Sequence, residues 1–209
     1  RSDCLSVRGI ARDLAAAGLG SLIELKVDKI KGGFVSDVKW LRKFNQQDEY
    51  LCPGVAGRFF KNVNNTSSPE WLKRRLTAIG LRPINALVDI TNYITYDLGR
   101  PLHVFDADKL KGDVYARLAK TGEKLEGLDE KTYELTEDMT VICDDSGVIG
   151  LAGVMGGEPT GCTEETENVF IEAAYFDPMR TAKTGRATGI NSDARYRFER
   201  GIDPDFTKY

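Results

Sequence analysis

The sequence contains only one histidine, His103, in 209 residues, and this scarcity limits the metal chemistry open to it. Zinc in proteins is held by histidine nitrogens, cysteine sulfurs and carboxylates, usually at short, fixed spacings. No two of the four cysteines have CxxC spacing; they are Cys4, Cys52, Cys143 and Cys162. The sequence therefore disfavours a zinc hydrolase or a zinc knuckle. We expect reduced cysteines, because nothing else in the chain indicates secretion.

Long apolar runs are also missing. No stretch reaches the roughly 18–20 residues that a membrane span needs. The N-terminal RSDCLSVRG has no apolar core of the kind that a signal peptide carries. These absences predict a cytoplasmic protein with no membrane partner. The chain does not begin with Met, so we expect it to be a piece of a longer protein.

The common fingerprints of nucleotide binding and covalent catalysis are absent. The glycine run from Ile149 to Gly161 lacks the Lys-Ser/Thr that completes a phosphate loop, and it is not a GxGxxG motif. There is no GxSxG nucleophile motif either. We therefore expect no cofactor and no metal in this chain. Any hydrolysis would use a positioned water instead of a covalent intermediate.

An excess of positive charge is absent too, because 29 basic and 32 acidic residues give a net charge of −3. Bulk charge therefore does not indicate nucleic-acid binding. Basic residues do gather locally, first at 73–75 and again between Arg180 and Arg200. The simpler interpretation of both clusters is a solvated helix face.

Helical patterns come mainly early in the chain and strand patterns mainly late. Helices are predicted over 3–17, 69–79, 84–98 and 178–188. Short strand-like runs occur over 22–34, another begins near position 57, and most recur from 114 to 176. This order predicts an α+β fold with a mixed, largely antiparallel sheet and flanking helices. A polar linker around 43–50 divides the chain into an N-terminal helix and linker region, 1–48, and a main domain, 49–209.

The most specific polar residues lie in two separated segments set among glycines and apolar residues. The first segment places Thr91 and Asn92 inside the predicted helix and His103 directly after it. Thr91 can bond back to a carbonyl of its own helix and Asn92 can be exposed, or either can point into a pocket. A single histidine is more often structural than functional, so both interpretations of His103 stay open.

The second segment is the glycine run that ends in Gly156, Gly157 and Glu158. A pair of glycines permits backbone conformations closed to other residues and lets a ligand approach the main chain closely. A tight hairpin end with an exposed acid is the alternative. Convergent polar groups among apolar residues are typical of a small, specific pocket, and we therefore expect the two segments to meet.

Together these segments resemble the beta subunit of bacterial phenylalanyl-tRNA synthetase. The resemblance rests on four stretches in order: RSDCLSVRGIARDLAA, SPEWLKRRLTAIGLRPINALVDITNYITYDLGRPLHVFDADKL, GLAGVMGGEPTGCTEETENVFIEAAYFDP and TGINSDARYRFERGIDP. It covers essentially the whole chain and stops at Tyr209. It implies that 49–209 form the family's B3/B4 editing domain, which hydrolyses tyrosine wrongly esterified to phenylalanine tRNA.

The resemblance also implies roles for individual residues. The family's site falls on three residues expected to be catalytic and three expected to bind substrate: His103, Thr91 and Asn92, and Glu158, Gly156 and Gly157. Glu158 is expected to be a buried carboxylate that accepts a hydrogen bond from the tyrosine phenol. Leaving such a group unpaired with phenylalanine costs roughly 1–3 kcal/mol, which gives selectivity.

The implied partners are the acceptor end of tRNA(Phe) and the synthetase alpha subunit of the full heterotetramer. ATP and Mg²⁺ belong to the full enzyme, and no cofactor is implied for this chain. An alternative from a different class is a tRNA- or protein-docking module of the synthetase with no chemistry of its own. A stand-alone small-molecule hydrolase is disfavoured by the missing Met and by the end of the chain just after RFERGID.

Overall fold

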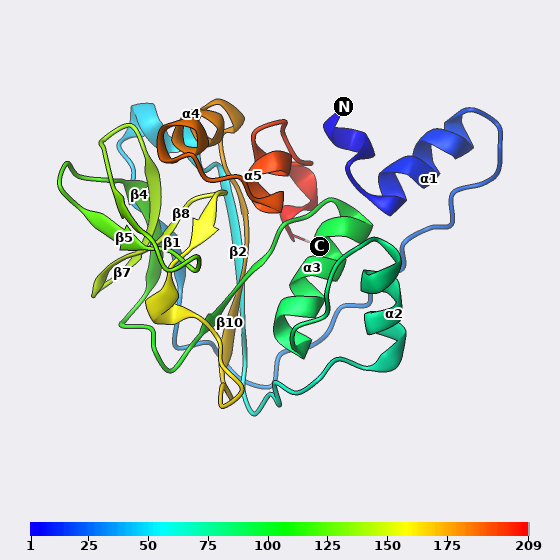
Figure 1. The fold of residues 1–209 in the computed structure, drawn as a ribbon, viewed down its shortest axis with the longest axis horizontal. Coiled ribbons are helices and arrows are strands. Elements are labelled where there is room, and N and C mark those ends of the chain that lie inside the picture. The colour runs from blue at the N-terminus through cyan, green and yellow to red at the C-terminus, as the bar shows by residue number, and fades with distance from the viewer. Residues whose placement is uncertain (209) are drawn as a thin grey trace.

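The computed structural model describes residues 1–208, with strands gathered on one side and most helices on the other (Figure 1). Its helices are α1 (Val7–Ala16), α2 (Glu70–Ala78), α3 (Ala86–Leu98), α4 (Pro178–Thr188) and α5 (Asp193–Phe198). Short 3-10 helices are η1 (Ser2–Cys4), η2 (Gln46–Leu51), η3 (Glu158–Thr160) and η4 (Asp205–Lys208). No helix of the described residues is long and apolar enough to span a bilayer.

Capping residues explain where the central helix α3 begins and ends. The Asn85 side chain accepts a hydrogen bond from the Val88 amide at 3.1 Å, which satisfies one of the free amides at the helix start. At the other end, Gly99 has a φ of 72°, the left-handed conformation that terminates many helices. Ser68, a residue type that often caps helices, instead donates to the buried Asp89 of α3 at 2.6 Å and so ties the start of α2 to α3.

Two main sheets form the strand-rich side. The first has the order β1-β4-β7-β8-β9, in which only the β1–β4 pairing is parallel. Its strands are β1 (Trp40–Arg42), β4 (Val114–Leu118), β7 (Thr140–Asp144), β8 (Gly147–Leu151) and β9 (Met155–Gly156). The second is antiparallel with the order β2-β10-β3. Its strands are β2 (Gly54–Phe60), β10 (Val169–Tyr175) and β3 (His103–Asp106).

A small two-stranded sheet, β5 (Lys124–Glu126) with β6 (Thr132–Glu134), completes the strands. Helices and predominantly antiparallel sheets together confirm the predicted α+β class. The residues expected to form a linker, 43–50, overlap the 3-10 helix η2. Its last residue, Leu51, lies just after the linker and is fully buried. The strand β1 lies before position 48 yet pairs with β4, so the first sheet includes residues on both sides of the boundary predicted from the sequence.

The principal core lies between the two main sheets and beneath α5. Phe105 of β3 and Phe170 of β10 are paired on adjacent strands of the second sheet, and both are fully buried. They belong to one apolar cluster with Ile149 of β8 and Phe198 of α5. Burying a side chain of this size contributes roughly 1.5–3 kcal/mol. This core fixes the separation between the sheets and therefore positions whatever lies at its edge.

Candidate functional site

A cavity of about 70 Å³ lies at the edge of this core, where the two main sheets approach each other. The second sheet contributes His103 and Phe105 from β3 and Glu172 from β10. The first sheet contributes residues of β7, β8 and β9, and α5 contributes Ala194 and Phe198. The walls are therefore mostly apolar, with a histidine and a carboxyl group as the ionisable side chains.

His103 and Glu172 are direct cross-strand partners in the β3–β10 register. Side chains of residues that face each other in an antiparallel pair lie on one face of the sheet, with Cβ atoms about 4.5–5.5 Å apart. Glu172 is 4% exposed, and its Oε2 has no hydrogen-bond partner in the described structure. The Nε2 of His103 is likewise buried and without a partner.

Buried polar atoms in native proteins are nearly always paired, so each exception requires an explanation. Two exceptions on opposite strands, both lining one cavity, indicate a place for a polar ligand or water. The cavity is large enough for a few water molecules. One wall residue, the half-buried Met155, has a flexible side chain that can adjust to a ligand. The site thus combines an apolar wall with two polar groups that need partners.

Burial shifts the pKa values of these two groups in opposite directions. Loss of solvation raises the pKa of the Glu172 carboxyl to about 8 and lowers the pKa of the His103 imidazole to about 4. In each case burial disfavours the charged form. At neutral pH the cavity therefore holds a protonated carboxyl group beside a neutral imidazole. Both forms can donate and accept hydrogen bonds.

Gly156 of β9 is in direct contact with the histidine ring. A Cβ atom added to Gly156 would lie 2.3 Å from Cε1 of His103, a distance that no real side chain could keep. The next residue, Gly157, is buried, and its amide donates to the carbonyl of Ile149 at 2.8 Å. Gly156 therefore allows β9 to pack against His103, whereas the sequence pattern predicts close approach of a ligand to the main chain.

The structure corrects the expectation that Glu158 is a buried carboxylate. Glu158 begins the 3-10 helix η3 and is exposed. It does not line the cavity, although it lies two residues after Gly156, which contacts His103. The turn into η3 carries its side chain to the surface, so it cannot provide the desolvated acceptor that was expected of it.

Thr91 and Asn92 both lie on α3, which contacts β3 but does not line the cavity. The Thr91 hydroxyl donates to the carbonyl of Val88 at 2.9 Å, the internal helix bond that the sequence allowed as an alternative. Asn92 is half-buried. The structure thus brings His103 and Gly156 together. It places the other predicted residues outside the cavity wall: Thr91, Asn92, Gly157 and Glu158.

The residue that sequence reasoning missed is Glu172. Its strand shows the alternation of a half-buried strand, because Phe170, Glu172 and Ala174 are all buried on the inward face. A carboxylic acid at an inward position of an otherwise apolar strand is unusual, since ionisable side chains are rarely fully buried. The period-two pattern of VFIEAAYF therefore held the signal, but only in combination with the register against β3.

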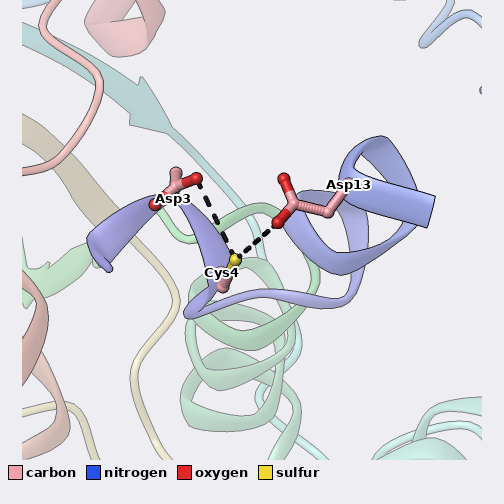
Figure 2. Close-up of side chains that lie close together, drawn as sticks. All are labelled: Asp3, Cys4 and Asp13. Atoms are coloured by element: carbon pink, nitrogen blue, oxygen red, sulfur yellow. Dashed lines mark hydrogen bonds between the residues drawn. The ribbon is translucent and has the colours of Figure 1, made fainter. Parts of the chain in front are cut away.

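Another cluster of ionisable groups lies at the N-terminus. The carboxylates of Asp3 and Asp13 converge on the thiol of Cys4, with an Sγ–Oδ2 distance of 3.2 Å to Asp13 (Figure 2). The guanidinium of Arg1 already bridges both carboxylates, at 2.5 Å and 2.7 Å. The hydrogen bond to Asp13 also raises the pKa of the Cys4 thiol, which disfavours the thiolate that binds metals. This cluster is an ion-pair network and does not indicate a metal site.

Comparison with known proteins places the chain in a family. Residues 51–209 match the B3/4 domain. The chain belongs to the B3/4 domain family. The phenylalanine–tRNA ligase beta subunit of Paramagnetospirillum magneticum is 62% identical over 206 residues, covering 99% of this chain and 26% of that protein. The corresponding subunit of Mesorhizobium japonicum is 57% identical and is covered to 25%.

A solved N-terminal fragment of the phenylalanyl-tRNA synthetase beta-subunit from Pyrococcus horikoshii is also similar, with 21% identity and a TM-score of 0.49. The alignment covers 83% of this chain and 52% of that one. The sequence matches confirm the resemblance predicted from the motifs. This B3/4 domain chain spans about a quarter of the length of the two curated relatives.

Proposed function

We propose that this B3/4 domain is the editing module of a phenylalanine–tRNA ligase beta subunit and hydrolyses the ester of tyrosine wrongly attached to tRNA(Phe). The relatives named above are beta subunits of that ligase, which supports the assignment to the enzyme. The reaction would use a positioned water. The partners would be the acceptor end of tRNA(Phe) and the alpha subunit, in the cytoplasm, while ATP and Mg²⁺ would serve the synthetic site of the full enzyme.

The need for such a module follows from the chemistry of the two amino acids. A synthetic pocket shaped for phenylalanine cannot strongly reject a molecule that merely adds a hydroxyl group, and discrimination of about 100-fold is typical. A second site must therefore recognise that hydroxyl. Recognition requires a polar group placed at the end of an apolar pocket.

The single observation that carries the proposal is the unpaired carboxyl group of Glu172 in an aromatic cavity. Phe105, Phe176 and Phe198 line the same cavity and would contact a phenol ring there. A ring needs more than the 70 Å³ of the cavity, roughly the 150 Å³ that holds benzene, so the flexible Met155 side chain would have to move. The Oε2 of Glu172 lacks a partner and can bond the phenol hydroxyl. Phenylalanine would leave this group desolvated and unpaired, at a penalty of roughly 1–3 kcal/mol.

We assign His103 to the ester or to the attacking water. His103 lines the cavity, its buried Nε2 has no partner, and its lowered pKa keeps the imidazole neutral at physiological pH. A neutral imidazole can accept a proton from water or donate a hydrogen bond to the ester carbonyl. Gly156 packs directly against the ring, and this contact supports a fixed orientation of the imidazole.

Thr91 and Asn92 remain candidates for holding the terminal adenosine or the ester from outside the cavity. Both lie on α3, whose end leads within a few residues to His103. Glu158, exposed two residues after Gly156, is a candidate for contacting the RNA or water instead of the phenol. This assignment keeps the predicted residues at the site but gives the selective role to Glu172.

Deacylation of Tyr-tRNA(Phe) and Phe-tRNA(Phe) by the chain and by its Glu172→Leu variant tests the proposal, because leucine offers the phenol no hydrogen-bonding group. We expect the unmodified chain to release tyrosine and to discriminate against phenylalanine, and Glu172→Leu to lose about 5- to 150-fold in discrimination, the equivalent of 1–3 kcal/mol. Glu158→Leu is the matched control, because it makes the same chemical change at an exposed position. A chain that binds tRNA but hydrolyses neither ester would support a docking module without chemistry.

A further inference from the structure

A group of aromatic and cationic side chains lies on the surface formed by α2 and α3. Trp71 of α2 is 54% exposed and meets Tyr93 of α3 edge to face, with ring centroids 5.7 Å apart. The guanidinium carbon of Arg75 lies 5.6 Å from each of the two ring centroids, and Arg75 donates to the Tyr93 hydroxyl. We call Trp71, Lys73, Arg74, Arg75 and Tyr93 the α2 surface.

Positive charge is concentrated at this surface although the chain as a whole carries −3. Between positions 69 and 82 there are four basic residues and one acidic residue, Glu70. Arg74 and Arg82 are exposed and form no ion pair or hydrogen bond within residues 1–208, and Lys73 meets Glu70 only at 4.0 Å. These cations are available to an external anion.

The packing of α2 does not require these side chains. Leu72 and Leu76 are the buried residues of the helix, and they supply its contact with the rest of the domain. Trp71 and Arg74 project away from that contact. A tryptophan with more than half of its surface in water is free to stack on a planar ligand.

We infer that the α2 surface binds single-stranded RNA, by stacking a base on Trp71 and by pairing phosphates with Arg74 and its basic neighbours. Stacking on an aromatic side chain is tolerant of sequence, since every base has a π-face, and it is combined with cationic side chains in proteins that bind single strands. Arginine forms strong, charge-assisted hydrogen bonds with phosphate. The inference rests on the proposed function, because the strand would be the 3′ end of the tRNA whose ester enters the cavity.

The position of α2 fits this role. Helix α3 contacts both α2 and β3, and Figure 1 shows α2 and α3 side by side with the strands on the far side of α3. The same helix that carries Tyr93 leads through Gly99 to His103. A strand held on the α2 surface would therefore have only α3 between it and the cavity.

A protein partner fits the same surface less well. Trp, Tyr and Arg are common in protein interfaces as well, but the α2 surface carries three consecutive cations, 73–75, which require a partner with closely spaced negative charges. The exposed apolar residues Val7 of α1 and Ile79 line a pocket together with Arg75 and Tyr93, whereas Lys73 and Arg74 do not line it. Charge and exposed aromatic rings together favour a polyanion with planar groups.

Fluorescence anisotropy with a labelled single-stranded RNA ending in CCA tests the inference on the chain itself, measured over a range of salt concentrations. We expect Trp71→Leu to weaken binding about 5- to 150-fold, the equivalent of one base stack, and Trp71→Phe to retain most of the affinity. Arg74→Ala should lower the slope of log affinity against log salt by about 0.7, the value for one phosphate contact with a single strand.

The matched control is Arg186→Ala, which removes an exposed arginine of α4 that also has no partner within residues 1–208. Affinity equal to wild type in Trp71→Leu and Arg74→Ala would overturn the inference, as would an equal loss in Arg186→Ala or no binding at low salt. Calorimetry with free tyrosine tests the cavity independently of RNA binding, so that failure of the proposed function can be told apart from failure of the RNA inference. If tyrosine does not bind but Trp71→Leu still weakens RNA binding, the proposed function fails and the RNA surface stands.

Discussion

His103 and Glu172 face each other across β3 and β10, and each has a buried polar atom without a partner. Their pKa values are displaced in opposite directions, to about 4 for the imidazole and about 8 for the carboxyl group. Between these values both side chains are uncharged. The cavity is therefore polar without carrying net charge, which suits a neutral phenol and a neutral ester.

Replacing His103 by alanine should slow the deacylation of Tyr-tRNA(Phe) by about 100- to 10,000-fold, the range for a positioned acid–base group. Because the imidazole has a pKa of about 4, the wild-type rate should not fall with the loss of neutral histidine between pH 7 and pH 5. Single-turnover kinetics across this range measure both effects. An unchanged rate in His103→Ala would assign the residue to structure alone.

Gly156→Ala should displace the His103 ring and so lower both stability and the rate of deacylation. The new Cβ would lie 2.3 Å from Cε1 of His103, so the ring or β9 must move. Overpacking of this kind costs about 1–3 kcal/mol, and a displaced catalytic group can lose about 100-fold in rate. Thermal unfolding and tyrosine deacylation measure the two effects.

The control for this variant is Gly54→Ala in β2. A Cβ added at Gly54 would meet no atom within 4 Å, and the residue does not require a left-handed backbone. We expect its stability and its rate to match those of the unmodified chain. Equal rates in Gly156→Ala and Gly54→Ala would show that close approach of β9 to His103 is not needed.

The chain should bind whole tRNA weakly at physiological salt. Its net charge is −3, and its basic residues form local clusters, so few phosphate contacts are available. We expect dissociation constants in the range of roughly 10⁻⁴–10⁻⁶ M that is usual for non-specific binding, with a strong dependence on salt. Filter binding at several salt concentrations measures this. Tight binding that resists salt would contradict this expectation.

The sequence predicted the class of the fold and four of the five α-helices of the described residues because their signals are local; it missed the short helix α5. Gly99 marks the end of α3 through cap chemistry, and apolar spacing marks the faces that pack. The strand-like runs predicted over 22–34 form no strand, because these residues are exposed and pair with no strand within residues 1–208. His103 and Gly156 were predicted as site residues, and the structure places them in contact, although the glycine pattern indicates approach of a ligand and not of another residue.

Glu172 could not be found in the same way, because its significance depends on a partner 69 positions earlier in the chain. Only the β3–β10 register shows that the carboxyl group lies opposite His103. The exposure of Glu158 depends similarly on the turn into η3, which a pair of glycines permits but does not dictate. Long-range register and loop direction are set by the packing of the whole domain, and no local pattern encodes them.

The buried pair also predicts how stability varies with pH. For Glu172 the folded pKa, about 8, lies above the ordinary value of 4.5, so the unfolded chain loses this proton first as pH rises. Stability linked to Glu172 is therefore complete below about pH 4.5 and falls as pH rises toward 8. For His103 the folded pKa lies below 6.5, so its contribution is complete above pH 6.5 and falls as pH drops toward 4.

Between about pH 4.5 and 6.5 the contributions of Glu172 and His103 change the stability in opposite directions as pH rises. Above that range only the contribution of Glu172 still varies with pH. Glu172→Gln lacks this titrating group. Its free energy of unfolding, relative to that of the unmodified chain, should therefore rise by up to a few kcal/mol between pH 5 and pH 8. Urea unfolding followed by tryptophan fluorescence at several pH values provides the measurement. Glu158→Gln should leave the pH dependence unchanged, because its carboxyl group is exposed. Parallel stability curves for the unmodified chain and Glu172→Gln would mean that the Glu172 carboxyl group is not desolvated in the folded protein, and the basis for selecting tyrosine would be lost with it.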